Sequence, residues 1–416
     1  MPSIVSPVRS PAARVYLTLI SVQSLAFALL FSLQGLYFVQ SAHLTPLELL
    51  MIGAVLEGSV FVLEMPTGVI ADVYSRRLSL VLGCLFLGLA AGLIGLFPSF
   101  AVIASAQVVS ALGYACLSGA QDAWLADELG EQRLEYMLLL GGQCGRVAGI
   151  VGILAATALS FLGLGVPILV GGVCLTGLSL YLARRMPEDH FTRTHESGHR
   201  QAMLDTLRGG VNAVRSSRIL GLLMLCALLY GASSEALDRL NEFHLIREVG
   251  LPQTLTPALW FTLLNLSGLV VGLVLTEPLR RRMEASEALG RPAPDRSGWL
   301  GLLTGLSLLA ILAFAFAPGF WWAAVAWTIL GALRAIYGPI YTAWLNGGLE
   351  SRSRATVNSL ASQADALGQV SFGPLFGLAG GLWGVQVALA LAALVRLPVL
   401  AVLRLGQQRL SRLRVG

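Results

Sequence analysis

The chain has 416 residues, of which 56% are hydrophobic and only 12% are charged, and its formal net charge is +5. Soluble proteins carry roughly 25% charged residues, so the composition excludes an ordinary soluble protein. Apolar runs of about 20 residues recur along the chain and indicate a helical protein that crosses a membrane many times, whereas the short alternating segments of a transmembrane barrel are missing.

In chain order, the apolar runs and their breakers predict an all-α polytopic membrane protein with twelve transmembrane helices. The first run is too long for the core of a signal peptide and is expected to be an uncleaved span. Five scattered cysteines lie within apolar runs without metal-ligand spacing, so we expect packing residues rather than disulfides or a metal site. The expected spans lie near 15–40, 47–71, 78–97, 100–126, 135–162, 166–184, 219–240, 256–276, 299–317, 320–345, 355–380 and 382–404.

The arginines indicate the orientation of these spans. All 28 basic residues are arginine, and 23 of them fall in segments that are cytoplasmic if both termini are cytoplasmic. Only Arg239 and Arg247 are assigned to outer loops. This asymmetry is the positive-inside signal, and it explains the net charge without a nucleic-acid partner.

The polar stretch 185–218 is expected to be a cytoplasmic linker with an amphipathic helix, between six-helix bundles at 1–184 and 219–416. His195 and His199 within it have the spacing of a metal site, but a solvated linker is the favoured interpretation. The sequence Ala-Trp-Leu at 123–125 recurs at 343–345, in corresponding spans of the two halves. We therefore expect two pseudo-symmetric bundles that meet at a central site.

Charged side chains within the spans are the main candidates for function, because a charge in the middle of a membrane costs about 2.5–3.5 kcal/mol or more. Asp365 is the expected partner of Arg334 and Asp122 that of Arg146, either as a structural pair or as a coupling pair. Arg396 is expected to extend its side chain to the interface. The candidates for proton coupling or substrate binding are Glu57, Glu64, Asp122, Arg146, Glu235, Asp238, Arg334 and Asp365.

Glu57 and Glu64 are seven residues apart and share one face of the second span. Two carboxylates there must face a partner or a water-filled cavity, where an acid can alternate between a proton and a substrate. The excess of acids over bases within the spans favours protons together with lipophilic or cationic substrates. Aromatic side chains offer stacking or cation–π surfaces, whereas the glutamines and asparagine could equally bond a neighbouring helix. The candidate cavity residues are Gln34, Tyr37, Trp124, Tyr230, Asn265, Tyr337, Tyr341 and Gln363.

The segment 68–77, between the second and third spans, resembles the loop signature G-x-x-x-D-x-x-G-R-[RK] of the major facilitator superfamily. Gly68, Asp72, Arg76 and Arg77 match this signature, and Ser75 replaces its second glycine. A degenerate copy keeps the acid-to-arginine spacing at Glu277 and Arg281. The stretches SGAQDAWLADEL (118–129), MPE (186–188) and SSEALDRLNEFHL (233–245) are similar to the bacterial drug:proton antiporter branch.

The resemblance implies the major facilitator fold, a cytoplasmic gate at 68–77, and proton-coupled export of lipophilic or cationic compounds by alternating access. It implies a monomer in the bacterial cytoplasmic (inner) membrane, with small-molecule substrate, protons and lipid as partners and the proton motive force in place of a cofactor. Uptake of a small nutrient such as a sugar or an organic acid is the alternative, since one fold supports many functions. Phosphate-binding, metalloprotease and nucleophile-elbow motifs are absent from the sequence, so no enzyme is expected.

Overall fold

The structure is a computed structural model that describes residues 10–69, 74–191, 212, 214, 215, 217–288, 296–347 and 351–403. Every element in these ranges is a helix. Contacts between residues divide the chain into two compact units. The first comprises Met1–Leu44 and Val55–Arg200, and the second comprises Thr45–Ala54 and Gln201–Gly416.

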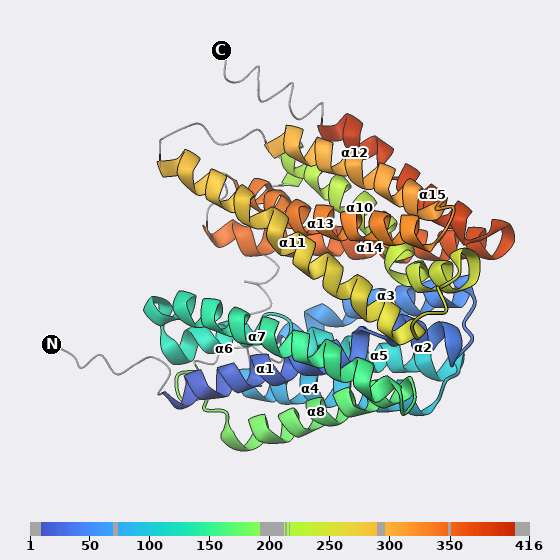
Figure 1. Ribbon diagram of the computed structural model, residues 1–416. Helices are drawn as coiled ribbons and strands as arrows, with labels where there is room; N and C mark the ends of the chain where they lie inside the picture. Colours follow the sequence, from blue (N-terminus) through green and yellow to red (C-terminus); the bar gives the residue numbers. More distant parts are fainter. Residues whose placement is uncertain are drawn as a thin grey trace, which may run out of the picture. The chain divides into compact units, whose positions relative to one another are not determined.

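In the first unit, α4 packs against α5 and α8, while α1 packs against α7 and α8 (Figure 1). Serine caps start two of these helices: Ser10 accepts a hydrogen bond from the Ala13 amide at 3.1 Å, and Ser75 accepts one from the Leu78 amide at 2.9 Å. The unit contains α1 (Pro11–Phe31), α2 (Gln34–Gln40), α4 (Arg76–Leu96), α5 (Phe100–Leu117), α6 (Ala120–Leu129), α7 (Glu131–Ser160) and α8 (Gly165–Arg185).

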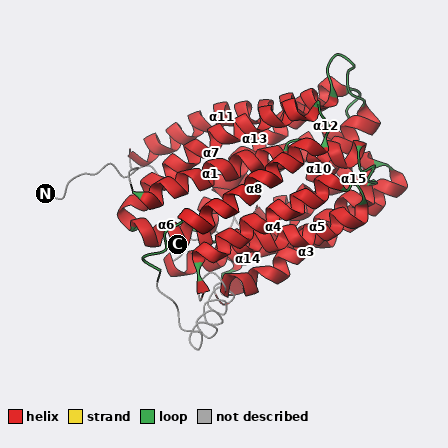
Figure 2. Cartoon of the chain, turned by 90° about the horizontal axis from the view of Figure 1, so that it is seen from below, coloured by secondary structure: helices red, strands yellow, loops and turns green. Residues whose placement is uncertain are grey.

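The second unit is built around α10, which packs against α14 and α15, while α13 packs against α11 and α12. In each unit the long helices lie roughly side by side (Figure 2). The elements are α10 (Arg218–Phe243), the π-helix η3 (His244–Val249), α11 (Pro257–Ala288), α12 (Arg296–Ala315), α13 (Phe320–Leu345), α14 (Ser351–Trp383) and α15 (Val385–Leu394).

The helix α3 (Pro46–Val69) contributes its first turns to the second unit and its remainder to the first. A capping box starts it: the Thr45 amide donates to Glu48 Oε2 at 2.8 Å, and the Glu48 amide donates to Thr45 Oγ1 at 3.3 Å. The sequence predicted a division into 1–184, 185–218 and 219–416. That division did not foresee that Thr45–Ala54 belongs to the second unit, and the division itself stays a prediction.

Two glycines bring α10 and α14 into close contact. A Cβ atom added at Gly231 would lie 2.1 Å from the Asp365 carbonyl oxygen, and one at Gly368 would lie 2.0 Å from the Leu228 carbonyl oxygen. Side chains at these positions would push the helices apart. The backbones of α10 and α14 therefore meet directly, which is typical of helix packing inside membranes.

Within the described residues, eleven helices are long and apolar enough to cross a membrane. The eleventh expected span corresponds to α14, which is not among these eleven, so the count of twelve stays a prediction. Arg239 was assigned to an outer loop, and this is corrected, because it lies inside α10. Asp72 and most of the expected amphipathic helix in the linker lie outside the described residues.

Candidate functional site

The second unit holds a cluster of charged side chains centred on α10. Glu235 is 4% exposed, and its Oε1 accepts a hydrogen bond from Arg239 Nε at 3.0 Å, one helical turn away. A Cβ atom at Gly53 of α3 would lie 1.7 Å from the same Oε1, so the α3 backbone lies directly against this ion pair. Glu235 is thus a packed and paired acid.

Asp238 pairs with Arg334 of α13 through both guanidinium Nη groups, and the Nη2–Oδ2 distance is 3.1 Å. The expected partner of Arg334 was Asp365, and this is corrected: the Asp365 carboxylate accepts a hydrogen bond from Gln369 Nε2 at 2.7 Å. The side chain of Asp238 is 49% exposed and that of Arg334 is 23% exposed. The pair therefore reaches open space although both residues lie in membrane-spanning helices.

Arg396, which was expected to extend to the interface, is only 2% exposed, and that expectation is corrected. The chain turns at Val395–Arg396 after α15, and Nε donates to Ser233 Oγ of α10 at 2.7 Å. Its guanidinium carbon lies 4.8 Å from the centre of the Tyr230 ring. The cation is therefore stabilised by an aromatic face inside the unit rather than by water.

Three of the predicted cavity aromatics form one stack. Tyr230 and Tyr337 have ring centroids 5.0 Å apart, and Tyr337 and Tyr341 have centroids 6.0 Å apart, with 11° between the ring planes in each pair. The Tyr341 hydroxyl donates to the Leu223 carbonyl oxygen at 2.9 Å. Tyr230 also interacts with Arg334, so the stack joins Arg334 to Arg396.

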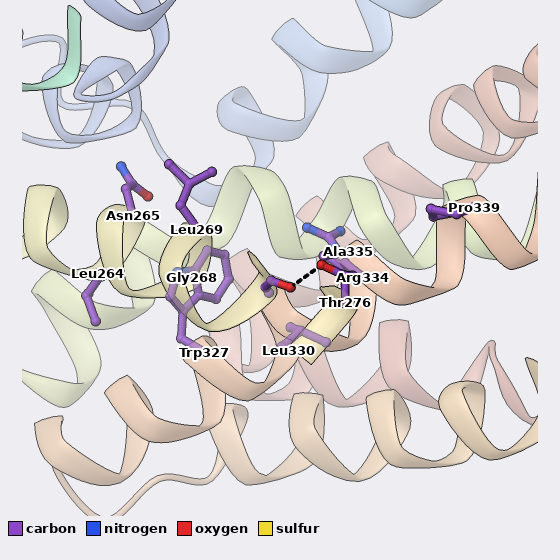
Figure 3. A pocket seen from close by; sticks show the side chains of 12 residues that line it. Leu264, Asn265, Gly268, Leu269, Thr276, Trp327, Leu330, Arg334, Ala335 and Pro339 are labelled. Atoms are coloured by element: carbon purple, nitrogen blue, oxygen red, sulfur yellow. Dashed lines mark hydrogen bonds between the residues drawn. The ribbon is translucent and has the colours of Figure 1, made fainter. Parts of the chain in front are cut away.

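A cavity of about 630 Å³ lies beside the Asp238–Arg334 pair, between α11 and α13 (Figure 3). Trp327 and Asn265 lie toward one end, and Arg334 and Pro339 toward the other. The volume is in the range of small-molecule sites. The lining residues are Leu264, Asn265, Gly268, Leu269, Gly272, Thr276, Trp327, Leu330, Gly331, Arg334, Ala335 and Pro339.

The predicted charged residues of the first unit lie on three different helices, α3, α6 and α7. Glu57 and Glu64 are half-buried on α3, while Asp122 on α6 and Arg146 on α7 are exposed. Among the described residues, no ion pair joins Asp122 to Arg146, which corrects the expected pairing. Asp122 instead lies near the buried Tyr16 of α1.

Two predicted cavity aromatics of the first unit are packing residues instead. Trp124 is 1% exposed and donates from Nε1 to the Pro187 carbonyl oxygen at 2.8 Å. Tyr37 is 3% exposed and donates to the Ile94 carbonyl oxygen at 2.6 Å. Gln34 is buried as well, and Gln363 on α14 is half-buried. Buried aromatic polar groups usually find a partner, and the backbone is the nearest one here.

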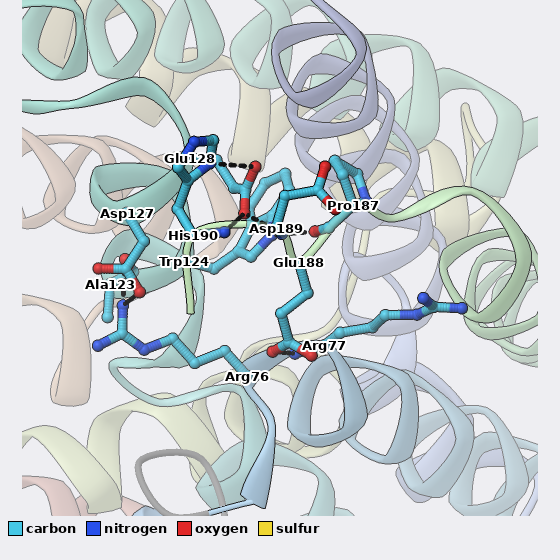
Figure 4. A network of polar contacts seen from close by, with 10 residues as sticks. All are labelled: Arg76, Arg77, Ala123, Trp124, Asp127, Glu128, Pro187, Glu188, Asp189 and His190. Carbon is cyan, nitrogen blue, oxygen red and sulfur yellow. Dashed lines mark hydrogen bonds and ion pairs between the residues drawn. The ribbon is translucent and has the colours of Figure 1, made fainter. Parts of the chain in front are cut away.

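The start of α4 is tied to α6 and to the segment after α8 by a polar network (Figure 4). Arg76 pairs with Asp127 and also donates to the Ala123 carbonyl oxygen. Glu188 accepts hydrogen bonds from Ser75 Oγ at 2.7 Å and from the Arg77 amide at 3.0 Å. Residues 75–77, at the end of the segment 68–77, therefore contact the stretches 118–129 and 186–188. Both stretches carry the sequence resemblance described above.

The acids of this network lie in the stretches 118–129 and 186–188 quoted above, but sequence reasoning did not single them out as site residues. Glu128 Oε1 accepts hydrogen bonds from the Asp189 and His190 amides at 2.9 Å and 3.1 Å. Asp127 and Glu128 end a span, where charge is common, and only the fold shows which groups they bind. The degenerate copy of the loop signature, at Glu277 and Arg281, forms an ion pair within one helix. Arg281 Nε donates to Glu277 Oε1 at 2.7 Å on an exposed face of α11. Gly68 continues α3.

Comparison with known proteins places the chain in a family. A family model described as Major Facilitator Superfamily matches residues 16–291. The uncharacterized MFS-type transporter YxaM of Bacillus subtilis (strain 168) is 22% identical over 348 residues, which cover 83% of this chain and 84% of that protein.

Solved structures show the same fold at low sequence identity. The nucleoside transporter NupG has a TM-score of 0.71 at 10% identity, covering 94% of this chain and 98% of that one. The peptide transporter POT in complex with sulfate has a TM-score of 0.74 at 13% identity, covering 97% and 95%. The chain is a multi-pass membrane protein and a secondary transporter that belongs to the Major Facilitator Superfamily.

Proposed function

We propose that this transporter is proton-coupled and that the cavity between α11 and α13 is where it binds lipophilic small molecules. The observation that supports this most is the Asp238–Arg334 pair beside a cavity of about 630 Å³. An acid in a membrane helix is costly unless it is paired or reaches water. Asp238 does both, so it can exchange a proton while its partner faces the ligand.

The first candidate direction is export, by alternating access of two six-helix bundles in the bacterial inner membrane, with both termini cytoplasmic. The stretches 118–129, 186–188 and 233–245 support it through their resemblance to drug:proton antiporters. In this direction Glu57 and Glu64, half-buried on α3, are further proton carriers and would attract a cationic substrate. The protein works as a monomer driven by the proton motive force, without a cofactor.

The second candidate is uptake of a lipophilic organic acid together with a proton. One observation favours it: Arg334 is the one charged residue that lines the cavity among the described residues. A cationic ligand in the cavity would meet a like charge, whereas an acid would meet its counterion.

The test uses purified protein in liposomes with an imposed pH gradient. Accumulation of a labelled lipophilic compound that needs the gradient, and that collapses with a protonophore, is the expected result. Movement of the compound against the inward proton gradient assigns export, and movement with the gradient assigns uptake. Transport that is indifferent to the gradient for every compound tried would refute proton coupling.

A further inference from the structure

We propose that the cavity between α11 and α13 binds a lipophilic organic anion through Arg334, and that Asp238 takes up one proton as the anion binds. This inference rests on the proposed function, since it specifies the ligand class of the same site. It also distinguishes the two candidate directions, because a proton and a ligand that bind together are carried together.

The lining of the cavity offers donors rather than acids. Most of its surface comes from leucine, alanine, glycine and the indole of Trp327, which suits an apolar or aromatic body. Arg334 Nε is buried and has no hydrogen-bond partner among the described residues. An unpartnered guanidinium nitrogen beside an apolar cavity is suited to an acidic oxygen of a ligand, because charge-assisted hydrogen bonds to carboxylate or sulfonate are strong.

Small residues create the space for such a body. Gly268 lines the cavity, and a Cβ atom added there would meet nothing within 4 Å. The Thr276 hydroxyl donates to the Gly272 carbonyl oxygen at 2.6 Å, so its hydrogen is already used by its own helix. The guanidinium of Arg334 is therefore the anchor that the cavity presents to an anion.

Charge balance links the anion to a proton. Both Nη groups of Arg334 bind the Asp238 carboxylate, so the empty site is a neutral pair. An anion that binds Arg334 shares its single positive charge with Asp238, so the loaded site would carry one uncompensated negative charge within a membrane helix. Protonation of Asp238 removes that charge, and the loaded site is neutral again.

The charged neighbours of Asp238 favour this exchange. Glu235 is paired with Arg239 on α10 itself. Asp365 of α14 is close enough to repel the Asp238 carboxylate, and so is Glu242 of α10. Arg396, just after α15, attracts it from farther away, but its guanidinium faces Tyr230 and Ser233. Arg334 is thus the cation to which the Asp238 carboxylate is hydrogen-bonded.

Calorimetric titration of the purified transporter in detergent tests the proposal directly. The probe is 2-naphthalenesulfonate, which stays ionised at every pH used, and the matched neutral probe is 2-naphthalenesulfonamide. Titration in two buffers of different ionisation enthalpy gives the number of protons bound. We expect about one proton per sulfonate, and hence up to about tenfold tighter binding per unit fall in pH while Asp238 is ionised in the free protein. Zero proton uptake would overturn the proposal.

Two substitutions separate the roles of the pair. Asp238→Asn should bind the sulfonate at all pH values without proton uptake, because asparagine stands in for the protonated acid. Arg334→Gln should weaken sulfonate binding by about ten- to a hundredfold and leave the sulfonamide unchanged. Equal weakening of both probes by Arg334→Gln would contradict an anion anchor.

A third substitution tests the cavity without touching either charge. Gly268→Leu should abolish binding of both probes, whereas Gly92→Leu, on α4 and equally unobstructed, should bind both normally. Binding that survives Gly268→Leu would place the site elsewhere. If pH-driven transport of other compounds persists while the sulfonate fails to bind, this inference is wrong and the proposed function stands. If the sulfonate binds together with a proton but no compound is transported, this inference stands and the proposed function is wrong.

Discussion

At the scale of single residues, each of the three arginines in the charged cluster of the second unit is placed by a specific partner. Arg334 binds Asp238 and Arg239 binds Glu235, while Arg396 lies over an aromatic ring. A charge without such a partner in hydrocarbon would be prohibitive. The same reasoning applies to His244, which is fully buried at the start of η3.

His244 faces two acceptors. Its Nε2 lies 3.0 Å from the Phe314 carbonyl oxygen, which can only accept, so Nε2 carries a hydrogen. Its Nδ1 lies 2.8 Å from Glu248 Oε2, while Glu248 Oε1 accepts from the Val385 amide at 2.8 Å. The contact between His244 and Glu248 therefore needs a second hydrogen, between Nδ1 and Oε2.

We predict that Glu248→Gln is nearly as stable as the wild type, because its amide can donate to Nδ1 and its oxygen can still cap α15. Glu248→Ala should cost about 1–3 kcal/mol, since it leaves buried polar groups unpaired. Thermal unfolding in detergent measures both. Equal destabilisation by the two substitutions would contradict this role of the Glu248 side chain.

At the scale of elements, the contact between α10 and α14 sets the position of the charged cluster. Gly231 and Gly368 let the two backbones meet, and this places Asp365 of α14 beside the acids of α10. The sequence shows two glycines among 46, without a sign of which ones carry a helix contact. Packing distances identify them.

We predict that Gly368→Ala destabilises the protein by several kcal/mol, because its Cβ would lie 2.0 Å from the Leu228 carbonyl oxygen and backbone cannot yield as a side chain does. Gly381→Ala, on the same helix, is the control: its Cβ would meet nothing within 4 Å. It should be neutral or slightly stabilising, since alanine favours helix. Similar melting temperatures for the two variants would show that α10 and α14 are not in close contact.

At the scale of the whole molecule, transport requires a group that carries the proton, and the chain offers candidates in both units. Asp238 is paired and open in the second unit, while Glu64 is half-buried on α3 in the first. If Glu64 drives export, its titration must be coupled to the substrate.

We predict that Glu64→Gln abolishes proton-dependent export from inverted membrane vesicles while the protein is still made at normal levels. Glu135→Gln, an exposed acid on α7, is the matched control and should export normally. Quantitative immunoblots of the same vesicles supply the amount of protein. Undiminished coupled export by Glu64→Gln would eliminate Glu64 as the proton carrier.

The sequence predicted the helical membrane class, nearly all of the helix positions and the set of costly charges. Eleven of the expected spans are matched by apolar helices, because hydrocarbon forces each segment to satisfy its own backbone. The motif at 68–77 indicated the superfamily to which the chain belongs, and the family model confirms that assignment.

The partners of those charges could not be predicted, since periodicity gives the face of a helix and not its neighbour. Asp365 was the expected partner of Arg334 and Asp238 is the observed one, while Arg396 points inward and Trp124 supports the segment after α8. These contacts depend on which helices pack together in the tertiary structure.

By itself, the sequence determined that this protein crosses a membrane as helices. It also determined which charged side chains lie in those helices, where the free-energy cost of burying a charge means that each needs a partner or a function. Both follow from the free energy of transfer into hydrocarbon, which is a property of each segment alone. Only the tertiary structure decided that Asp238 and Arg334 form an open pair at the end of an apolar cavity. That arrangement depends on the rotation and spacing of α10, α11 and α13, which contacts between distant parts of the chain fix.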